Sequence, residues 1–215
     1  MENQIKQTVK FVKSTLDGAE SGHDWFHIER VYKMACTINK KEKGDVQIIS
    51  LAALLHDIAD SKFHDGDEEI GPQKAREFLL AIGVSIEVVE AVISIIRNMS
   101  FKKSFEGDVV RSKELDIVQD ADRLDAIGAI GIARTFNYGG YKNRAMYDPA
   151  IKPEMNHTKE SYKNSTAPTI NHFYEKLLLL KDQMNTETAR RLAEQRHQFM
   201  EQFLAQFHAE WEGKR

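Results

Sequence analysis

Cysteine is almost absent from this chain, in which Cys36 is the one thiol among 215 residues. No internal disulfide can form, so the chain lacks the staples on which small secreted scaffolds depend. Cys36 falls within a predicted helix, where we expect an inert residue of the core or of its boundary.

Long apolar runs and a large excess of either charge are also missing. No stretch approaches the roughly 18 apolar residues of a transmembrane helix, and the first residues, MENQIKQTVK, lack the hydrophobic region of a signal peptide. A net charge of -3 gives no general attraction to nucleic acid or to anionic membranes. We therefore expect a cytoplasmic protein with neither nucleic acid nor a membrane as partner.

No segment shows a convincing strand pattern, whereas apolar residues recur at helical spacing along most of the chain. The length is enough for one domain with a substantial core, so we predict a single all-α domain over residues 1–215. An irregular stretch is expected over residues 137–169, which hold three of the four prolines. The predicted helices cover residues 2–16, 25–40, 46–58, 70–82, 86–98, 113–136, 170–184 and 187–210.

The dipeptide His-Asp occurs three times, and its surroundings single out one copy. His56-Asp57 closes the apolar run VQIISLAALLHDI, which is typical of a buried central helix, whereas His23-Asp24 and His64-Asp65 lie in polar surroundings. An unpaired His and Asp would be costly to bury, and adjacent residues at a helix end can hold one small ion from two sides. The alternative is a helix end that emerges into water with two ordinary polar residues.

His27 lies on the inward stripe of the predicted helix over residues 25–40, for which Asp24 is a suitable N-cap. By itself, a histidine on an apolar face is more often a hydrogen-bonded core residue than a metal ligand.

Asp122 and Asp125 project from one otherwise apolar face of the helix predicted over residues 113–136. Considered alone, they could equally be buried aspartates bonded to Arg123, Arg134 or backbone amides. Beside the His56-Asp57 pair, a metal ligand becomes the better interpretation of Asp122.

The order and spacing of these residues resemble a known signature. His27 with Arg30-Val31, then His56-Asp57, then Asp122 within QDADRLDAIG are similar to the H…HD…D motif of the HD-domain superfamily of metal-dependent phosphohydrolases. The segments GGYKNRAMYDP and TINHFYEKLLLLKDQMNTETARRLAEQRHQFMEQF resemble its small bacterial branch associated with nucleoside triphosphate pyrophosphohydrolase activity. The resemblance covers nearly the whole chain and implies a metal core over about residues 20–135, a loop over 137–169 and C-terminal helices over 170–211.

Two other branches of that superfamily fit less well. The extra histidines and the GYP triplet of cyclic-di-GMP phosphodiesterases are absent. Hydrolases of (p)ppGpp have an HDxxED motif, where this chain has the shorter acid Asp60 followed by Ser61. The difference weakens the (p)ppGpp interpretation without eliminating it.

The four residues His27, His56, Asp57 and Asp122 predict a site for one divalent metal ion. Two imidazoles and two carboxylates without a thiolate suit Mn²⁺, Fe²⁺, Co²⁺, Ni²⁺ or Zn²⁺ better than a dedicated Mg²⁺ site, and the resemblance favours Mn²⁺. Asp60, about one turn beyond His56, or Asp125 could accept the proton of an attacking water.

An anionic substrate needs cations, and these occur near the predicted helices of the metal site and in the irregular stretch. That stretch interleaves cations with tyrosines, which suits charge-assisted bonds and stacking on a base, and the resemblance favours a lid over the site. The alternative is a solvated mobile loop with ordinary lysines. The candidate substrate contacts are Lys102, Arg123, Lys142, Arg144, His172 and Lys176.

The apolar stripes of the last forty or so residues, such as Leu192, Phe199 and Phe203, favour a core or a homodimer surface over chemistry.

The sequence therefore predicts hydrolysis of a nucleotide, with cleavage of a nucleoside triphosphate to monophosphate and pyrophosphate as the leading version. Phosphomonoester hydrolysis needs the same metal and water, so no residue separates the two. A non-catalytic metal- or nucleotide-binding regulatory protein is the alternative of another class. A helical scaffold with chance placement of His and Asp is a further one.

Overall fold

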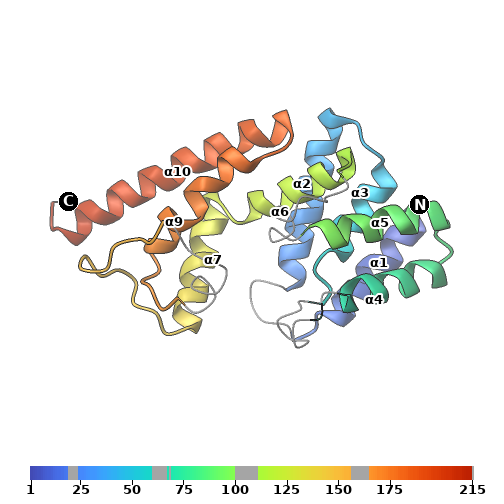
Figure 1. Cartoon of the computed structure of the whole chain (residues 1–215), viewed down its shortest axis with the longest axis horizontal. Helices are drawn as coiled ribbons and strands as arrows, with labels where there is room; N and C mark the ends of the chain where they lie inside the picture. Colours follow the sequence, from blue (N-terminus) through green and yellow to red (C-terminus); the bar gives the residue numbers. More distant parts are fainter. Residues whose placement is uncertain (19–23, 60–66, 68, 100–110, 156–164, 215) are drawn as a thin grey trace. The chain divides into compact units, whose positions relative to one another are not determined.

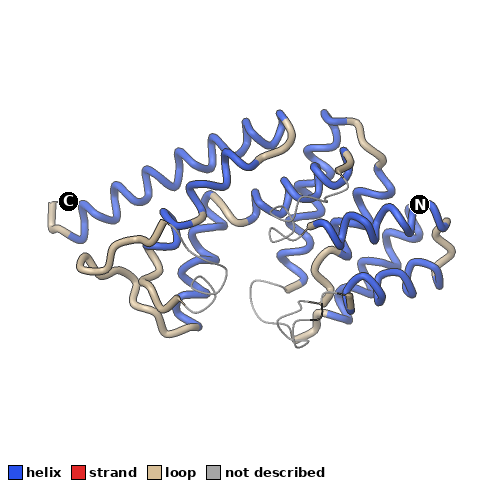
Figure 2. Tube along the Cα trace, in the orientation of Figure 1, coloured by secondary structure: helices blue, strands red, loops and turns tan. Residues whose placement is uncertain are grey.

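The structure, a computed structural model, describes residues 1–18, 24–59, 67, 69–99, 111–155 and 165–214. Within these ranges it is helical without a strand (Figures 1 and 2), which confirms the all-α prediction. None of the helices described there is long and apolar enough to cross a membrane. The chain divides into two compact units, Met1–Asp122 and Arg123–Arg215. The single domain stays a prediction, because compactness of each unit does not decide whether the two unfold together.

The first unit is built around α3, whose residues from Ile49 to Leu55 are all buried. Helices α1, α2 and α5 pack against α3, and α4 packs against α5 (Figure 1). At the N-terminus of α3 the Asp45 carboxylate accepts hydrogen bonds from the backbone N–H groups of Gln47 and Ile48. The bounds are α1 Glu2–Thr15, α2 Trp25–Glu42, α3 Val46–Leu55, α4 Ile70–Ala81, α5 Ile86–Asn98 and, continuing into the second unit, α6 Lys113–Asp125.

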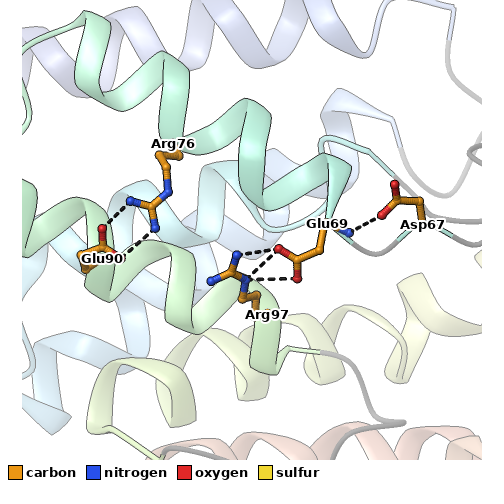
Figure 3. A network of polar contacts seen from close by, with 5 residues as sticks. All are labelled: Asp67, Glu69, Arg76, Glu90 and Arg97. Atoms are coloured by element: carbon orange, nitrogen blue, oxygen red, sulfur yellow. Dashed lines mark hydrogen bonds and ion pairs between the residues drawn. The ribbon is translucent and has the colours of Figure 1, made fainter.

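Two arginine–glutamate pairs join α4 to α5 along their exposed sides (Figure 3). Arg76 donates through both terminal nitrogens to Glu90, and Arg97 donates to Glu69 at the start of α4. The backbone N–H of Glu69 in turn donates to Asp67 at 2.8 Å. Exposed ion pairs contribute little to stability by themselves, so the apolar faces of α4 and α5 determine how the two helices pack.

The second unit contains α7 Gly128–Tyr141, α9 Asn171–Glu175, the 3-10 helix η3 Leu177–Gln183 and α10 Glu187–Trp211. Helix α10 packs against α7 and η3, and η3 packs against α9. Phe136, Phe173, Phe203 and Phe207 form an aromatic cluster with ring centroids 5.9 to 6.4 Å apart. Leu177, Leu180 and Leu204 of the C-terminal apolar stripes are buried in the core, whereas Leu179 and Phe199 are 42% and 49% exposed.

The prediction of one helix over residues 113–136 is wrong, because the chain breaks between α6 and α7. Ile127 is extended, and Gly128 has a φ of +76°, a left-handed conformation that only glycine adopts at no steric cost. After the break α7 continues to Tyr141, so residues 137–141 are helical where an irregular turn was expected.

Two other boundaries also differ from the prediction. Helix α3 ends at Leu55, three residues before the expected Ile58, so that His56 and Asp57 lie in the turn that follows it. The expected helix over residues 170–184 is instead the short α9 followed by the tighter η3.

Candidate metal centre

Three of the four predicted metal ligands converge in the first unit. His27 lies in the first turn of α2, where its backbone N–H donates to the N-cap carboxylate of Asp24. His56 and Asp57 follow the last residue of α3. One ligand atom each from His27, His56 and Asp57 can be chosen so that all lie within 4.8 Å of one another. The spacing is that of groups that can share one ion.

Asp122 on α6 joins this group as the fourth predicted ligand. Its Oδ1 lies 3.5 Å from Nε2 of His27 and 3.9 Å from Nε2 of His56. Both histidines therefore turn the same ring nitrogen towards one carboxylate oxygen, an arrangement that brings residues about 95 positions apart in sequence together.

The ring orientation of His56 is fixed by a main-chain atom. Its Nδ1 lies 2.9 Å from the carbonyl oxygen of Ala53, one turn earlier in α3. A carbonyl oxygen only accepts hydrogen bonds, so Nδ1 is the donor and Nε2 is the ring nitrogen left to bind an ion. Metal-binding histidines are oriented in this way by a partner on the second ring nitrogen.

The four side chains differ in their access to solvent. The side chains of His27 and His56 are 3% and 5% exposed, whereas that of Asp122 is 39% exposed. The two histidine rings are thus buried, whereas the Asp122 carboxylate is partly open to solvent. Such a donor set, two neutral nitrogens and two carboxylates, fits a divalent transition-metal ion and has no cysteine thiolate to select a softer one.

Asp125, predicted as a proton acceptor, lies in the second unit and is 5% exposed. Its Oδ2 accepts a hydrogen bond from Nη1 of Arg134 at 2.6 Å, which is the alternative that the sequence left open. Arg123, a predicted substrate contact, donates to the backbone carbonyl of Gln183. These two roles in catalysis or binding stay predictions, and each residue has a structural partner within its own unit.

Asp60 and Lys102 lie outside the described residues. Their predicted roles as proton acceptor and phosphate contact therefore stay predictions.

The remaining predicted substrate residues lie in the second unit. Lys142 and Arg144 follow α7, and His172 and Lys176 lie on and just after α9. Burial, with the charges of Lys176 and Arg144 adding to it, lowers the pKa of His172 from 6.5 to about 3. The structure thus brings Arg144, His172 and Lys176 into electrostatic contact, and His172 is neutral at pH 7.

Two features near the metal centre carry no signal in the sequence pattern. The carbonyl of Ala53 is a main-chain group, which no residue type reveals. Asp120 is fully buried two residues before Asp122, on a different side of α6 because two residues turn a helix by about 200°. Asp120 was not among the residues that the sequence singled out.

Comparison with known proteins agrees with this geometry. Residues 25–127 match the family described as HD domain, a range that contains all four predicted ligands. The Bacillus subtilis protein YpgQ is 42% identical over 206 residues, which cover 94% of this chain and 91% of YpgQ. The chain belongs to the HD-domain family. It is a metal-dependent phosphohydrolase.

Solved structures of HD-domain proteins extend the likeness to nearly the whole chain. An HD-superfamily hydrolase from Bacillus thuringiensis matches with a TM-score of 0.78 and 48% identity, covering 98% of both chains. YpgQ from Bacillus subtilis, solved in complex with ADP, matches with a TM-score of 0.76 and 38% identity, covering 97% of this chain and 95% of that one. These matches include the second unit as well as the HD domain.

Proposed function

We propose that this HD-domain protein hydrolyses nucleoside triphosphates to the monophosphate and pyrophosphate, with Mn²⁺ held by His27, His56, Asp57 and Asp122. The observation that carries the proposal is the convergence of these four side chains, with Nε2 of both histidines near one oxygen of Asp122. The ADP bound to YpgQ supports a nucleotide as the ligand.

Each side chain has a definite task in this scheme. His56 presents Nε2 because its Nδ1 is engaged by Ala53, and His27 presents Nε2 from the first turn of α2. Asp57 and Asp122 supply negative charge that offsets a divalent cation. A divalent ion held by these residues would supply Lewis-acid chemistry for the attack of water on a phosphoryl group.

The test is product analysis on a panel of nucleoside triphosphates with Mn²⁺. We expect the full-length protein to release pyrophosphate and a nucleoside monophosphate. His56→Ala and Asp57→Ala should lose the activity and the bound metal, as measured by elemental analysis. His208→Gln is the matched control, because His208 contacts Tyr174 in the second unit and should leave activity and metal content unchanged.

The products also separate the proposal from its rivals. Inorganic phosphate in place of pyrophosphate would overturn the proposal, and release of phosphate from a nucleoside monophosphate would favour phosphomonoester hydrolysis. If the wild type binds metal, but neither it nor the variants turn over any nucleotide, nucleotide hydrolysis is overturned.

A further inference from the structure

The first turn of α2 carries the proposed metal ligand His27 and is closed by Asp24, the N-cap residue. Oδ1 of Asp24 accepts a hydrogen bond from the backbone N–H of His27 at 3.0 Å, and the carbonyl oxygen of Asp24 accepts one from the N–H of Ile28 at 3.3 Å. The N–H of His27 is one of the donors at a helix start that have no acceptor within the helix itself. The main chain of this ligand is therefore held by the Asp24 side chain.

The two histidines of the metal centre differ in how their helices hold them. His56 follows α3, which is buried from Ile49 to Leu55, and its Nδ1 is hydrogen-bonded to the carbonyl oxygen of Ala53. His27 is instead the third residue of α2, and the ends of helices open far more readily than buried helix centres. A contact that prevents fraying is thus more important for His27 than for His56.

The two residues between Asp24 and His27 add little to the stability of this turn. The side chain of Phe26 is 63% exposed. Trp25 is half-buried, and Nζ of the exposed Lys13 lies 4.7 Å from its ring centre, which is a cation–π contact of modest strength in an open setting. The hydrogen bond from His27 to Asp24 is therefore the contact that fixes the turn directly at the ligand.

A metal centre is sensitive to small displacements of its ligands, because metal–ligand distances vary by only about 0.2 Å around their preferred values. Fraying of a helical turn changes the backbone dihedral angles and moves the attached side chain by more than this. A ligand that is disordered before the ion binds also loses conformational entropy when it binds. Without its cap, the first turn of α2 would present His27 less often in a position that suits an ion.

We propose that Asp24 is a positioning residue of the metal centre, whose carboxylate fixes the first turn of α2 and so holds His27 in place for a divalent ion. The role depends on the hydrogen bond to the main chain of His27 and not on the negative charge of the carboxylate. Asn or Ser, which are equally good N-caps, would therefore replace Asp24. The inference rests on the proposed function only for the ion and its four ligands.

Titration of the full-length protein with Mn²⁺, after removal of bound metal, tests this role without any substrate. Electron paramagnetic resonance measures the free Mn²⁺. Asp24→Ala should weaken Mn²⁺ binding about tenfold, a usual loss when a residue that orients a metal ligand is removed. Asp24→Asn and Asp24→Ser should bind Mn²⁺ within about twofold of the wild type, because both keep an acceptor for the N–H of His27.

Asp45→Ala is the matched control, because it removes the same kind of cap from α3 in the same unit. The ten residues of α3 place this cap about 15 Å from His56. Thermal unfolding of the metal-free proteins should show that both alanine variants fold and that both lose stability. The Mn²⁺ affinity of Asp45→Ala should nevertheless stay within about twofold of the wild type.

The outcomes separate this inference from the proposed function. Unchanged Mn²⁺ affinity in Asp24→Ala, with binding lost in His56→Ala, would overturn the positioning role and leave the proposed function intact. A loss in Asp45→Ala as large as that in Asp24→Ala would also overturn the role, since it would reflect general stability, and an equal loss in Asp24→Asn would show an effect of charge instead. Affinity that depends on the cap as expected, in a protein that releases no pyrophosphate, would support the role and overturn the proposed hydrolysis. Absence of Mn²⁺ binding by the wild type would overturn both.

Discussion

His172 is held neutral near pH 7 by its surroundings. Its ring is largely buried, and Lys176 and Arg144 raise the cost of a further positive charge. A neutral imidazole keeps one donor and one acceptor, so its contacts do not depend on pH near neutrality.

The stability of the protein should therefore depend on His172 in acid. The unfolded chain takes up a proton there below about pH 6.5, whereas the folded chain takes it up only near pH 3. The free energy of unfolding is therefore unaffected by protonation of His172 above pH 6.5 and falls as the pH is lowered towards 3. Between pH 7 and pH 5 the loss amounts to at most about 2 kcal/mol. Denaturant unfolding at both pH values should show a smaller acid loss in His172→Gln than in the wild type. Equal losses in the two proteins would contradict this assignment, and His208→Gln is the control.

The proposed metal ligands were predictable from the sequence around them, because residue type alone does not distinguish them from other His and Asp residues. His56 and Asp57 stood out because an apolar run precedes them, and their convergence with His27 agrees with that interpretation. Asp125 was as good a candidate as Asp122 from helical spacing alone. The ion pair with Arg134 distinguishes it, and a tertiary contact of that kind leaves no periodic pattern in the chain.

Among the elements, α3 is the one on which the metal centre depends most. It is buried from Ile49 to Leu55 and ends directly before His56 and Asp57, so its position sets theirs. Its N-terminus is held by the two hydrogen bonds that Asp45 accepts.

Asp45→Ala should lower the free energy of unfolding by about 1 kcal/mol, because loss of the capping carboxylate leaves two backbone N–H groups without their partner. Thermal unfolding measures the change. Asp17→Ala is a matched control, since Asp17 is exposed beyond the end of α1. An equal effect of the two substitutions would show that the cap contributes nothing specific.

The adjacent glycines near the end of α7 give a second prediction for an element. Gly139→Ala should lower the free energy of unfolding by about 1 to 3 kcal/mol, because its Cβ would overlap Thr169. Gly140→Ala should leave stability unchanged or raise it by up to about 1 kcal/mol, since no atom lies within 4 Å and alanine favours a helix. Changes of the same sign in both variants, measured by thermal unfolding, would contradict the close packing.

The helices were predictable wherever one apolar face decided the structure, as in α2, α5 and α10. The break between α6 and α7 was not, because the apolar pattern continues across it while the conformation of Gly128 ends the helix. Glycine within a helical pattern can be tolerated or can end the helix, and the close approach of the Arg196 side chain to Gly128 is a tertiary feature. Similarly, the 3-10 geometry of η3 has no periodic signature in LLLLKDQ.

For the whole molecule, the division into two units has a thermodynamic consequence. All four proposed metal ligands lie in Met1–Asp122, so metal binding stabilises that unit directly. Hydrogen exchange with and without Mn²⁺ should show greater protection in α2, α3 and the ligand-bearing part of α6. We expect α10 to exchange at the same rate in both states, since opening of the second unit breaks no metal contact. An equal gain of protection in α10 would instead show that the chain unfolds as one cooperative domain.

The break at Gly128 also bears on how such a chain can diversify. The match to the HD domain stops at residue 127, one residue before α7 begins. A lineage could therefore exchange everything after this glycine while inheriting the metal ligands unchanged. Substitutions on the two sides of this border would then be selected separately, because only the first side holds the four proposed metal ligands.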